Sequence, residues 1–106
     1  MISIEDFQKL DLRVAKILNV EDHPNADKLF VLKISLGDEE KQLVAGLKGH
    51  YNKEELIGKQ IIVINNLEPA MLRGVKSEGM LLAAEDDINV AILIPEKEIK
   101  ENSKIR

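Results

Sequence analysis

Residues 52–66 are Asn-Lys-Glu-Glu-Leu-Ile-Gly-Lys-Gln-Ile-Ile-Val-Ile-Asn-Asn, which sets a short helix directly before an apolar strand. Asn52 suits a helix N-cap, and Glu55 stands where its carboxylate can bond the backbone of that cap. Gly58 suits the left-handed residue that ends a helix. The β-branched run that follows predicts a strand, which Pro69 bounds. The segment therefore predicts a single helix of about one to two turns between two strands.

Four further apolar stretches have the spacing or the boundaries of strands. In the longest stretch, the alternation of apolar and polar residues breaks between Val14 and Ile17, which predicts a β-bulge near Ala15. Glycine and acidic residues at 37–40 predict a hairpin turn. Strands are expected at residues 12–20, 28–36, 41–47, 60–66 and 79–84.

Five strands with a helix between the third and fourth is the order of an OB-fold, a small Greek-key barrel. A β-sandwich needs about seven strands, and a βαβ fold needs a longer helix after each strand. We therefore predict an all-β chain with one domain over residues 1–106. Its OB-fold five-stranded Greek-key barrel is expected over about residues 11–85, with one short helix between strands 3 and 4.

N- and C-terminal extensions flank the predicted barrel. Ser3 and the three residues after it resemble a capping box, which predicts a short N-terminal helical turn. Residues 89–94 form another apolar strand, stopped by Pro95, within a C-terminal extension of about residues 88–106. Apolar segments outside a barrel have to be covered, either by their own barrel or by a second copy of the chain.

Composition excludes several classes of protein. The 106 residues are 44% hydrophobic and 32% charged, which is ordinary for one globular domain. No apolar run approaches the roughly 20 residues that a membrane span needs, so no membrane partner is expected. The absence of cysteine removes disulfides and thiolate metal sites and fits a cytoplasmic protein.

The net charge of −4 would argue against nucleic acid if the charge were spread evenly. Residues 41–84, however, carry six Lys and Arg against four Glu, which allows a basic face on an acidic protein. The alternative is that these charges simply alternate on a solvated surface. Within this region, Arg73, Lys76, Ser77 and Met80 fall close together, and they suit contact with a polyanion that carries stackable bases.

No catalytic residue, metal or cofactor is expected. His23 and His50 lack a third ligand at a recognised spacing, and His23 precedes a proline and suits a turn. Ser77, His50 and Asp27 could be drawn as a triad, but their flanks supply no nucleophile elbow. The chain also lacks a phosphate-cradling glycine loop.

Five segments in register carry a family resemblance over nearly the whole chain. They are Asp11-Leu12-Arg13-Val14-Ala15-Lys16-Ile17, His23-Pro24-Asn25-Ala26-Asp27-Lys28-Leu29, Gln42-Leu43-Val44-Ala45-Gly46-Leu47, Glu54-Glu55-Leu56-Ile57-Gly58-Lys59 and residues 66–84. They resemble the tRNA-binding domain family, which includes the C-terminal domain of many methionyl-tRNA synthetases, a free-standing dimeric tRNA-binding protein and cytokine-like domains of synthetase complexes. Small departures are Ala15, where the family more often has glycine, and Ala45, where serine is common.

The resemblance implies a non-catalytic homodimer that binds tRNA by shape and raises the tRNA affinity of a methionyl-tRNA synthetase catalytic domain, in the same or a separate chain. The tail is most similar to synthetase-appended members, in which the extension helps make the dimer. The family's tRNA contacts fall on Lys28, Asn66, Arg73, Ser77 and Met80. The loop composition adds Lys76, because lysine and arginine neutralise phosphates.

Only Phe7, Phe30 and Tyr51 are aromatic, which favours recognition of a folded RNA backbone over stacking of splayed bases. Two other functions stay open. A chaperone-like, peptide-binding OB-fold dimer would show an apolar groove. A pure dimerisation or docking domain would need its C-terminal extension and not its loops.

Overall fold

β1 (Leu12–Asp22) is long enough to pair with two partners in turn. Residues 12–16 pair with β4 (Gln60–Ile64), and residues 16–22 pair with β2 (Phe30–Ser35), both antiparallel. The register shifts between Ile17 and Asn19, which places a bulge there and lets the strand coil. The sequence predicted this bulge near Ala15, which is instead an ordinary partner of Ile61.

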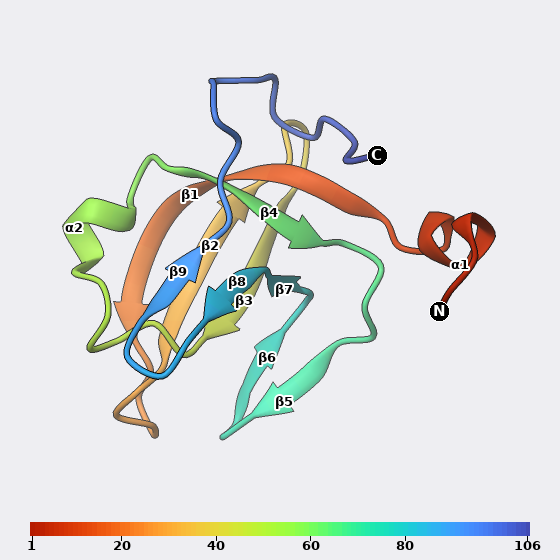
Figure 1. Ribbon diagram of the computed structural model, residues 1–106. Coiled ribbons are helices and arrows are strands. Elements are labelled where there is room, and N and C mark those ends of the chain that lie inside the picture. The colour runs from red at the N-terminus through yellow and green to blue at the C-terminus, as the bar shows by residue number, and fades with distance from the viewer.

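The main sheet has the spatial order β3–β2–β1–β4–β7, with β3 at Glu40–Ala45 and β7 at Met80–Leu81. The segment before β7 returns to β3, where the Glu78 N–H donates to the carbonyl oxygen of Gln42 at 2.8 Å. The sheet thus curls into a nearly closed barrel, which Figure 1 shows from one side. The computed structural model describes residues 1–106 and confirms the predicted all-β, OB-like barrel.

Helix α2 (Lys53–Leu56) lies between β3 and β4, as predicted. The Glu55 carboxylate accepts the Asn52 N–H at 2.7 Å, and Gly58 takes a positive φ of 90° just after the helix. The helix sends Leu56, which is fully buried, into the barrel core. The other core residues are Ala15, Ile17, Val20, Phe30, Leu32, Ile34, Leu36, Leu43, Leu47, Ile61, Val63 and Leu81.

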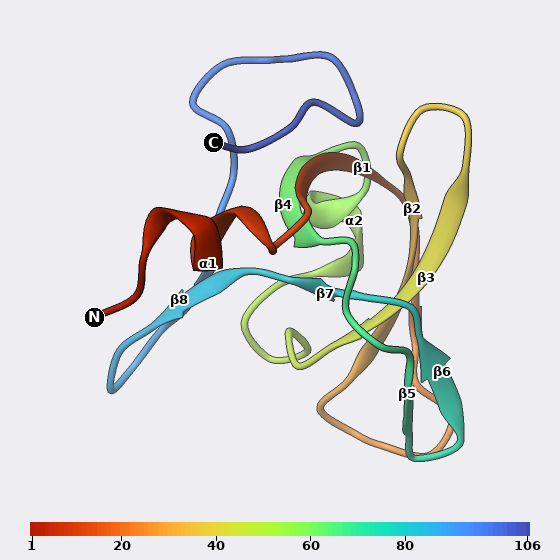
Figure 2. The ribbon, with the colours of Figure 1, turned by 90° about the vertical axis from the view of Figure 1, so that its right-hand side faces the viewer.

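Two small hairpins depart from the prediction. β5 (Ala70–Leu72) and β6 (Val75–Ser77) form the first, where the sequence predicted only a loop. The predicted strand 79–84 is split, because after β7 the chain leaves β4 as β8 (Ala83–Glu85) and pairs with β9 (Val90–Ile92). Figure 2 shows the β5–β6 hairpin projecting beside the β1–β2 loop.

Both extensions contact the barrel. Helix α1 (Ile4–Gln8) begins at Ser3, whose hydroxyl accepts the Asp6 N–H at 3.1 Å, as the sequence predicted. The C-terminal tail lies along β1, where Val14 N–H donates to Ser103 and Ile105 N–H donates to Leu12. The tail backbone therefore packs on its own barrel, one of the two arrangements left open above. Neither helix has the length and apolar character to cross a membrane.

Gly79 enters the barrel where no side chain fits. Its φ is +149°, and an added Cβ would lie 2.8 Å from the backbone oxygen of Ile64. We expect Gly79→Ala to lower the free energy of unfolding by about 2–3 kcal/mol, measured by urea denaturation. The control is Gly49→Ala, which meets a similar strain at φ +96° but has no atom within 4 Å. Equal losses for the two variants would contradict a steric role for Gly79.

Candidate nucleic-acid interface

The β1–β2 loop and the tip of the β5–β6 hairpin are held together by hydrogen bonds. The Arg73 guanidinium donates through Nη2 to the backbone oxygen of Asn25 at 3.2 Å. In return, the Asn25 side-chain amide donates to the backbone oxygen of Arg73 at 3.1 Å. Next to this pair, His23 Nε2 lies 2.8 Å from the carbonyl oxygen of Leu72. Two segments about 50 residues apart in sequence therefore form one surface.

The hairpin turn places Arg73 at its tip. Arg73 and Gly74 both have positive φ, 54° and 89°, which is the backbone of a two-residue type I′ turn. Glycine adopts this conformation freely, whereas arginine is strained there. The reciprocal bonds with Asn25 offset that strain and hold the Arg73 backbone in place.

The three predicted cations are all exposed in this region. Lys28 lies in the β1–β2 loop, three residues after Asn25, and Lys76 lies on β6. None of the three cations belongs to one of the ion pairs within the chain. Lys28, Arg73 and Lys76 are called the cationic lip below.

Ser77 lies beneath this surface. It is 4% exposed, and its hydroxyl accepts the N–H of Val44 at 3.0 Å and donates to the carbonyl oxygen of Gly79 at 2.9 Å. The hydroxyl thereby joins β3 to the segment that closes the barrel. Its contact with tRNA, predicted from the family resemblance, stays a prediction.

Asn66 is exposed, but both ends of its amide are used within the chain. Its Oδ1 accepts the N–H of Asp11 at 2.9 Å, and its Nδ2 donates to the carbonyl oxygen of Lys9 at 2.7 Å. Burial alone would raise the pKa of the Asp11 carboxyl, but hydrogen bonds from Arg13 and Asn65 hold it below the ordinary value. Asn66 thus lies with the N-terminal extension, away from the residues that contact the hairpin tip, and its predicted tRNA contact also stays a prediction.

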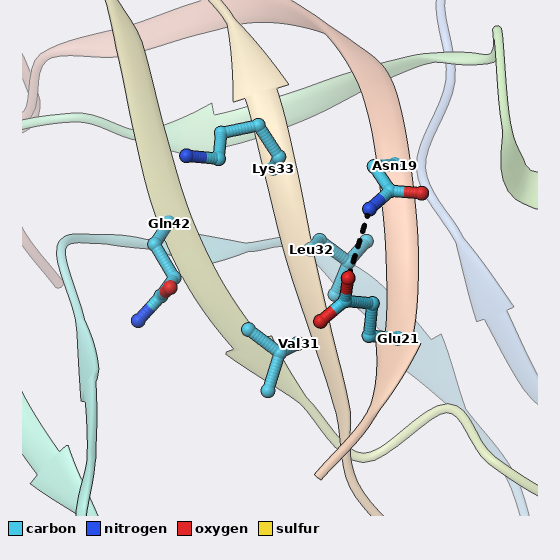
Figure 3. A pocket seen from close by; sticks show the side chains of 6 residues that line it. All are labelled: Asn19, Glu21, Val31, Leu32, Lys33 and Gln42. Atoms are coloured by element: carbon cyan, nitrogen blue, oxygen red, sulfur yellow. Dashed lines mark hydrogen bonds between the residues drawn. The ribbon is translucent and has the colours of Figure 1, made fainter.

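A polar hollow of about 220 Å³ continues the surface over the open face of the sheet (Figure 3). Its lining residues are Asn19, Glu21, Val31, Leu32, Lys33 and Gln42. The Gln42 amide donates to the carbonyl oxygen of Lys76 at 2.8 Å, which joins this face to the cationic lip. Alternation in β2, which sets Lys33 opposite the core residues, was a signal for this face in the sequence, but no motif singled it out.

A second cationic group lies at the end of β1, directly before the β1–β2 loop. Asp22 is paired with Lys53 at 3.1 Å and with Lys48 at 3.4 Å. The hydrogen bond from Lys53 is the main cause that lowers the pKa of the Asp22 carboxyl. Two ammonium groups share the Asp22 carboxylate, and Glu54 lines the same hollow. Sequence reasoning missed this cluster, because its members come from three separate elements.

Met80 begins β7 and is 47% exposed, and its predicted contact with tRNA stays a prediction. It also lines an apolar hollow of about 250 Å³ between β3, β7 and the β8–β9 hairpin. The other residues of this hollow are Val44, Ala45, Gly46, Leu47, Leu81, Ala83 and Val90. The cationic lip is thus accompanied by an apolar recess that could hold a base, a ribose or an apolar side chain.

The arrangement offers no catalytic constellation. The Ser77 hydroxyl bonds backbone groups, and His23 bonds the backbone of Leu72 and Asn25. No three His, Asp or Glu side chains converge so that they could hold a metal ion. The exposed groups supply positive charge and hydrogen-bond donors, which are the elements of a binding surface.

A family model described as "Putative tRNA binding domain" matches residues 12–104, and the chain belongs to this tRNA-binding domain family. It is 59% identical over 106 residues to the methionine–tRNA ligase of Nanoarchaeum equitans, covering 100% of this chain. It is 58% identical over 105 residues to that of Thermococcus onnurineus, covering 99%. In both cases the chain spans 14% of the relative's length.

Solved structures also resemble the chain over its full length. A methionyl-tRNA synthetase (MetRS) related protein from Pyrococcus horikoshii has a TM-score of 0.93 and 29% identity, and the match covers 100% of this chain and 98% of that one. The CsaA chaperone protein from Picrophilus torridus has a TM-score of 0.93 and 36% identity, with both chains covered completely. The same barrel therefore occurs both in a MetRS-related protein and in a chaperone protein.

Removal of the Ser77 hydroxyl tests its role in barrel closure. We expect Ser77→Ala to lower the free energy of unfolding by about 1–3 kcal/mol, because it leaves the buried N–H of Val44 without a partner. Urea denaturation measures this loss. The control is Ser103→Ala, whose hydroxyl bonds only the Lys100 carbonyl oxygen near the surface, so it should lose less. A smaller loss for Ser77→Ala than for Ser103→Ala would contradict this role.

Proposed function

We propose that this chain is a non-catalytic tRNA-binding module that recognises the folded shape of tRNA. In this proposal it acts as the C-terminal appended domain, or a separate subunit, of a cytoplasmic methionyl-tRNA synthetase and raises the affinity of that enzyme for tRNA. The observation that carries the proposal is the cationic lip, exposed and free of ion pairs in a chain whose family is named for tRNA binding.

The proposed contacts divide by chemistry. Lys28, Arg73 and Lys76 neutralise phosphates, which positions the RNA without reading its sequence. Met80 packs against a base or ribose at the edge of the apolar recess. Asn66 and Ser77 are kept as contacts of the proposal, and each would have to exchange an internal hydrogen bond for one to RNA.

The share of the relatives' length that this chain covers supports a role beside a synthetase. The relatives named above are methionine–tRNA ligases, and this chain corresponds to 14% of their length. A barrel of this size without a reaction centre fits a binding unit of such an enzyme. A separate tRNA contact raises affinity through effective concentration, because the second binding event becomes intramolecular.

Dimerisation forms part of the proposal. Ile94 and Ile99 of the C-terminal extension are 54% and 46% exposed, although the backbone around them bonds the barrel. Ile4 and Leu10 of the N-terminal extension border a hollow of about 240 Å³ that Ile105 also lines. A second copy of the chain would cover these apolar groups.

Peptide binding is the second candidate function, and the apolar recess beside Met80 favours it. Seven of the eight residues that line this recess are hydrophobic, which suits an extended apolar peptide. Structural likeness to a chaperone points the same way. A pure docking domain is the third reading, in which loop substitutions would leave function intact.

The salt dependence of RNA binding tests the leading proposal. We expect Arg73→Gln to weaken tRNA binding and to lower the slope of log affinity against log salt by about one unit. Gel shifts at several salt concentrations measure both quantities. The matched control is Lys97→Gln, which removes an exposed cation of the C-terminal extension that, like Arg73, belongs to no ion pair within the chain. An unchanged slope for Arg73→Gln would mean that Arg73 does not contact phosphate.

The same assay separates the candidate functions. Folded tRNA, single-stranded RNA of equal length and duplex DNA are compared at near-physiological salt. Preference for folded tRNA supports recognition by shape. Binding of an unfolded polypeptide, with no binding of tRNA, would instead establish the peptide-binding reading.

Charge placed on the extensions tests dimerisation. We expect Ile94→Glu combined with Ile99→Glu to give a monomer at micromolar concentration, because a carboxylate cannot be buried there without a partner. Sedimentation measures the oligomeric state. The control is Met71→Glu on β5, which is 65% exposed and lies on the hairpin, away from the extensions. A parent chain that sediments as a monomer would overturn the dimer proposal.

A further inference from the structure

The His23 side chain lies between the β1–β2 loop and the β5–β6 hairpin and uses both ring nitrogens. It is 6% exposed, and its Nδ1 accepts the N–H of Asn25 at 2.9 Å while its Nε2 lies 2.8 Å from the carbonyl oxygen of Leu72. A backbone N–H can only donate and a carbonyl oxygen can only accept. We therefore assign the neutral tautomer that carries its proton on Nε2. The His23 imidazole thus makes a hydrogen bond within its own turn and another to the end of β5, 49 residues away.

Burial does little to hold the tip of this hairpin. Met71 and Leu72 of β5 are 65% and 38% exposed, so this strand contributes no fully buried side chain to the core. At the base, Gln42 and Ser77 tie the hairpin to β3. At the tip, the hydrogen bonds to the rest of the chain involve His23 and Asn25. The orientation of the tip thus depends on a few polar contacts with the β1–β2 loop.

We infer that His23 is a positioning residue for RNA binding. It fixes the hairpin tip with Arg73 against the loop that carries Lys28 before RNA arrives. This inference rests on the proposed function, in which both cations contact phosphate. A hairpin that is already fixed loses less conformational freedom on binding, so the same contacts give a higher affinity. His23 acts through Arg73 and does not itself contact the RNA.

Two substitutions separate the two hydrogen bonds of the ring. In His23→Asn, the side-chain oxygen can accept the N–H two residues on, as in an Asx turn, but the amide is too short to reach Leu72. In His23→Gln, the longer amide places its N–H₂ near the position of Nε2 and can donate to Leu72. If His23 served only its own turn, Asn would be the better replacement. If it locks the hairpin, Gln is the better one.

Titration of tRNA against the full chain at several salt concentrations tests the inference. We expect His23→Asn to weaken binding about three- to tenfold, which corresponds to one net hydrogen bond. Its salt slope should equal that of the parent, because no phosphate-binding cation is lost. His23→Gln should bind within about twofold of the parent. Parent-like binding by His23→Asn, or a larger loss for His23→Gln, would overturn the inference.

Measurements on the free protein separate this inference from the proposed function. Amide hydrogen exchange at residues 70–77 should accelerate in His23→Asn and stay close to the parent rate in His23→Gln. Long-range ¹H–¹⁵N spectra of the parent should show the Nε2-protonated tautomer. A parent that shows the locked hairpin but binds no tRNA would overturn the proposed function, and the RNA role of His23 with it. A parent that binds tRNA, with exchange unaffected in His23→Asn, would overturn the positioning role alone.

Discussion

Closure of the barrel combines a backbone hydrogen bond from Glu78 to Gln42 with bonds made by the buried hydroxyl of Ser77. Between β3 and the segment that leads into β7, Ser77 Oγ accepts a hydrogen bond from the Val44 N–H and donates one to the carbonyl oxygen of Gly79. Gly79 can follow directly because it lacks a Cβ that would meet the Ile64 backbone. With Ser77 and Gly79 turned inward, the neighbouring Lys76 and Met80 face outward. The contact that completes the core therefore also sets the spacing of the candidate interface.

The sequence indicated the architecture well, because its strands and its helix carry local signals. Asn52 and Glu55 cap the helix where expected, and Ser3 caps α1. The bulge was predicted at the wrong residue. A break in the apolar–polar alternation shows that the strand must coil, but it does not show at which residue the coil occurs. The β5–β6 hairpin was missed, since three-residue strands carry little periodicity and its turn begins with an arginine at positive φ.

The candidate site was only half visible in the sequence. The family resemblance pointed to Lys28 and Arg73 and the loop composition to Lys76, and all three are exposed. The internal hydrogen bonds of Ser77 and Asn66 join segments 33 and 55 residues apart, and sequence spacing gives no sign of such long-range contacts. The same limitation hid the role of His23, which looked like an ordinary turn residue. Net charge was also a poor guide, since this acidic chain presents three exposed cations that belong to no ion pair.

The C-terminal tail has a consequence for how this barrel avoids misassembly. Residues 12–15 of β1 pair with β4 on one side, whereas β2 begins to pair only at Lys16. The C-terminal tail covers this unpaired edge of β1 through backbone hydrogen bonds that involve Asn102, Ser103 and Ile105. An uncovered edge presents free N–H and C=O groups that recruit strands from other molecules. The C-terminal segment around residues 102–105 thus protects the edge of β1 from pairing with strands of other molecules. Its removal would favour aggregation of an otherwise folded barrel.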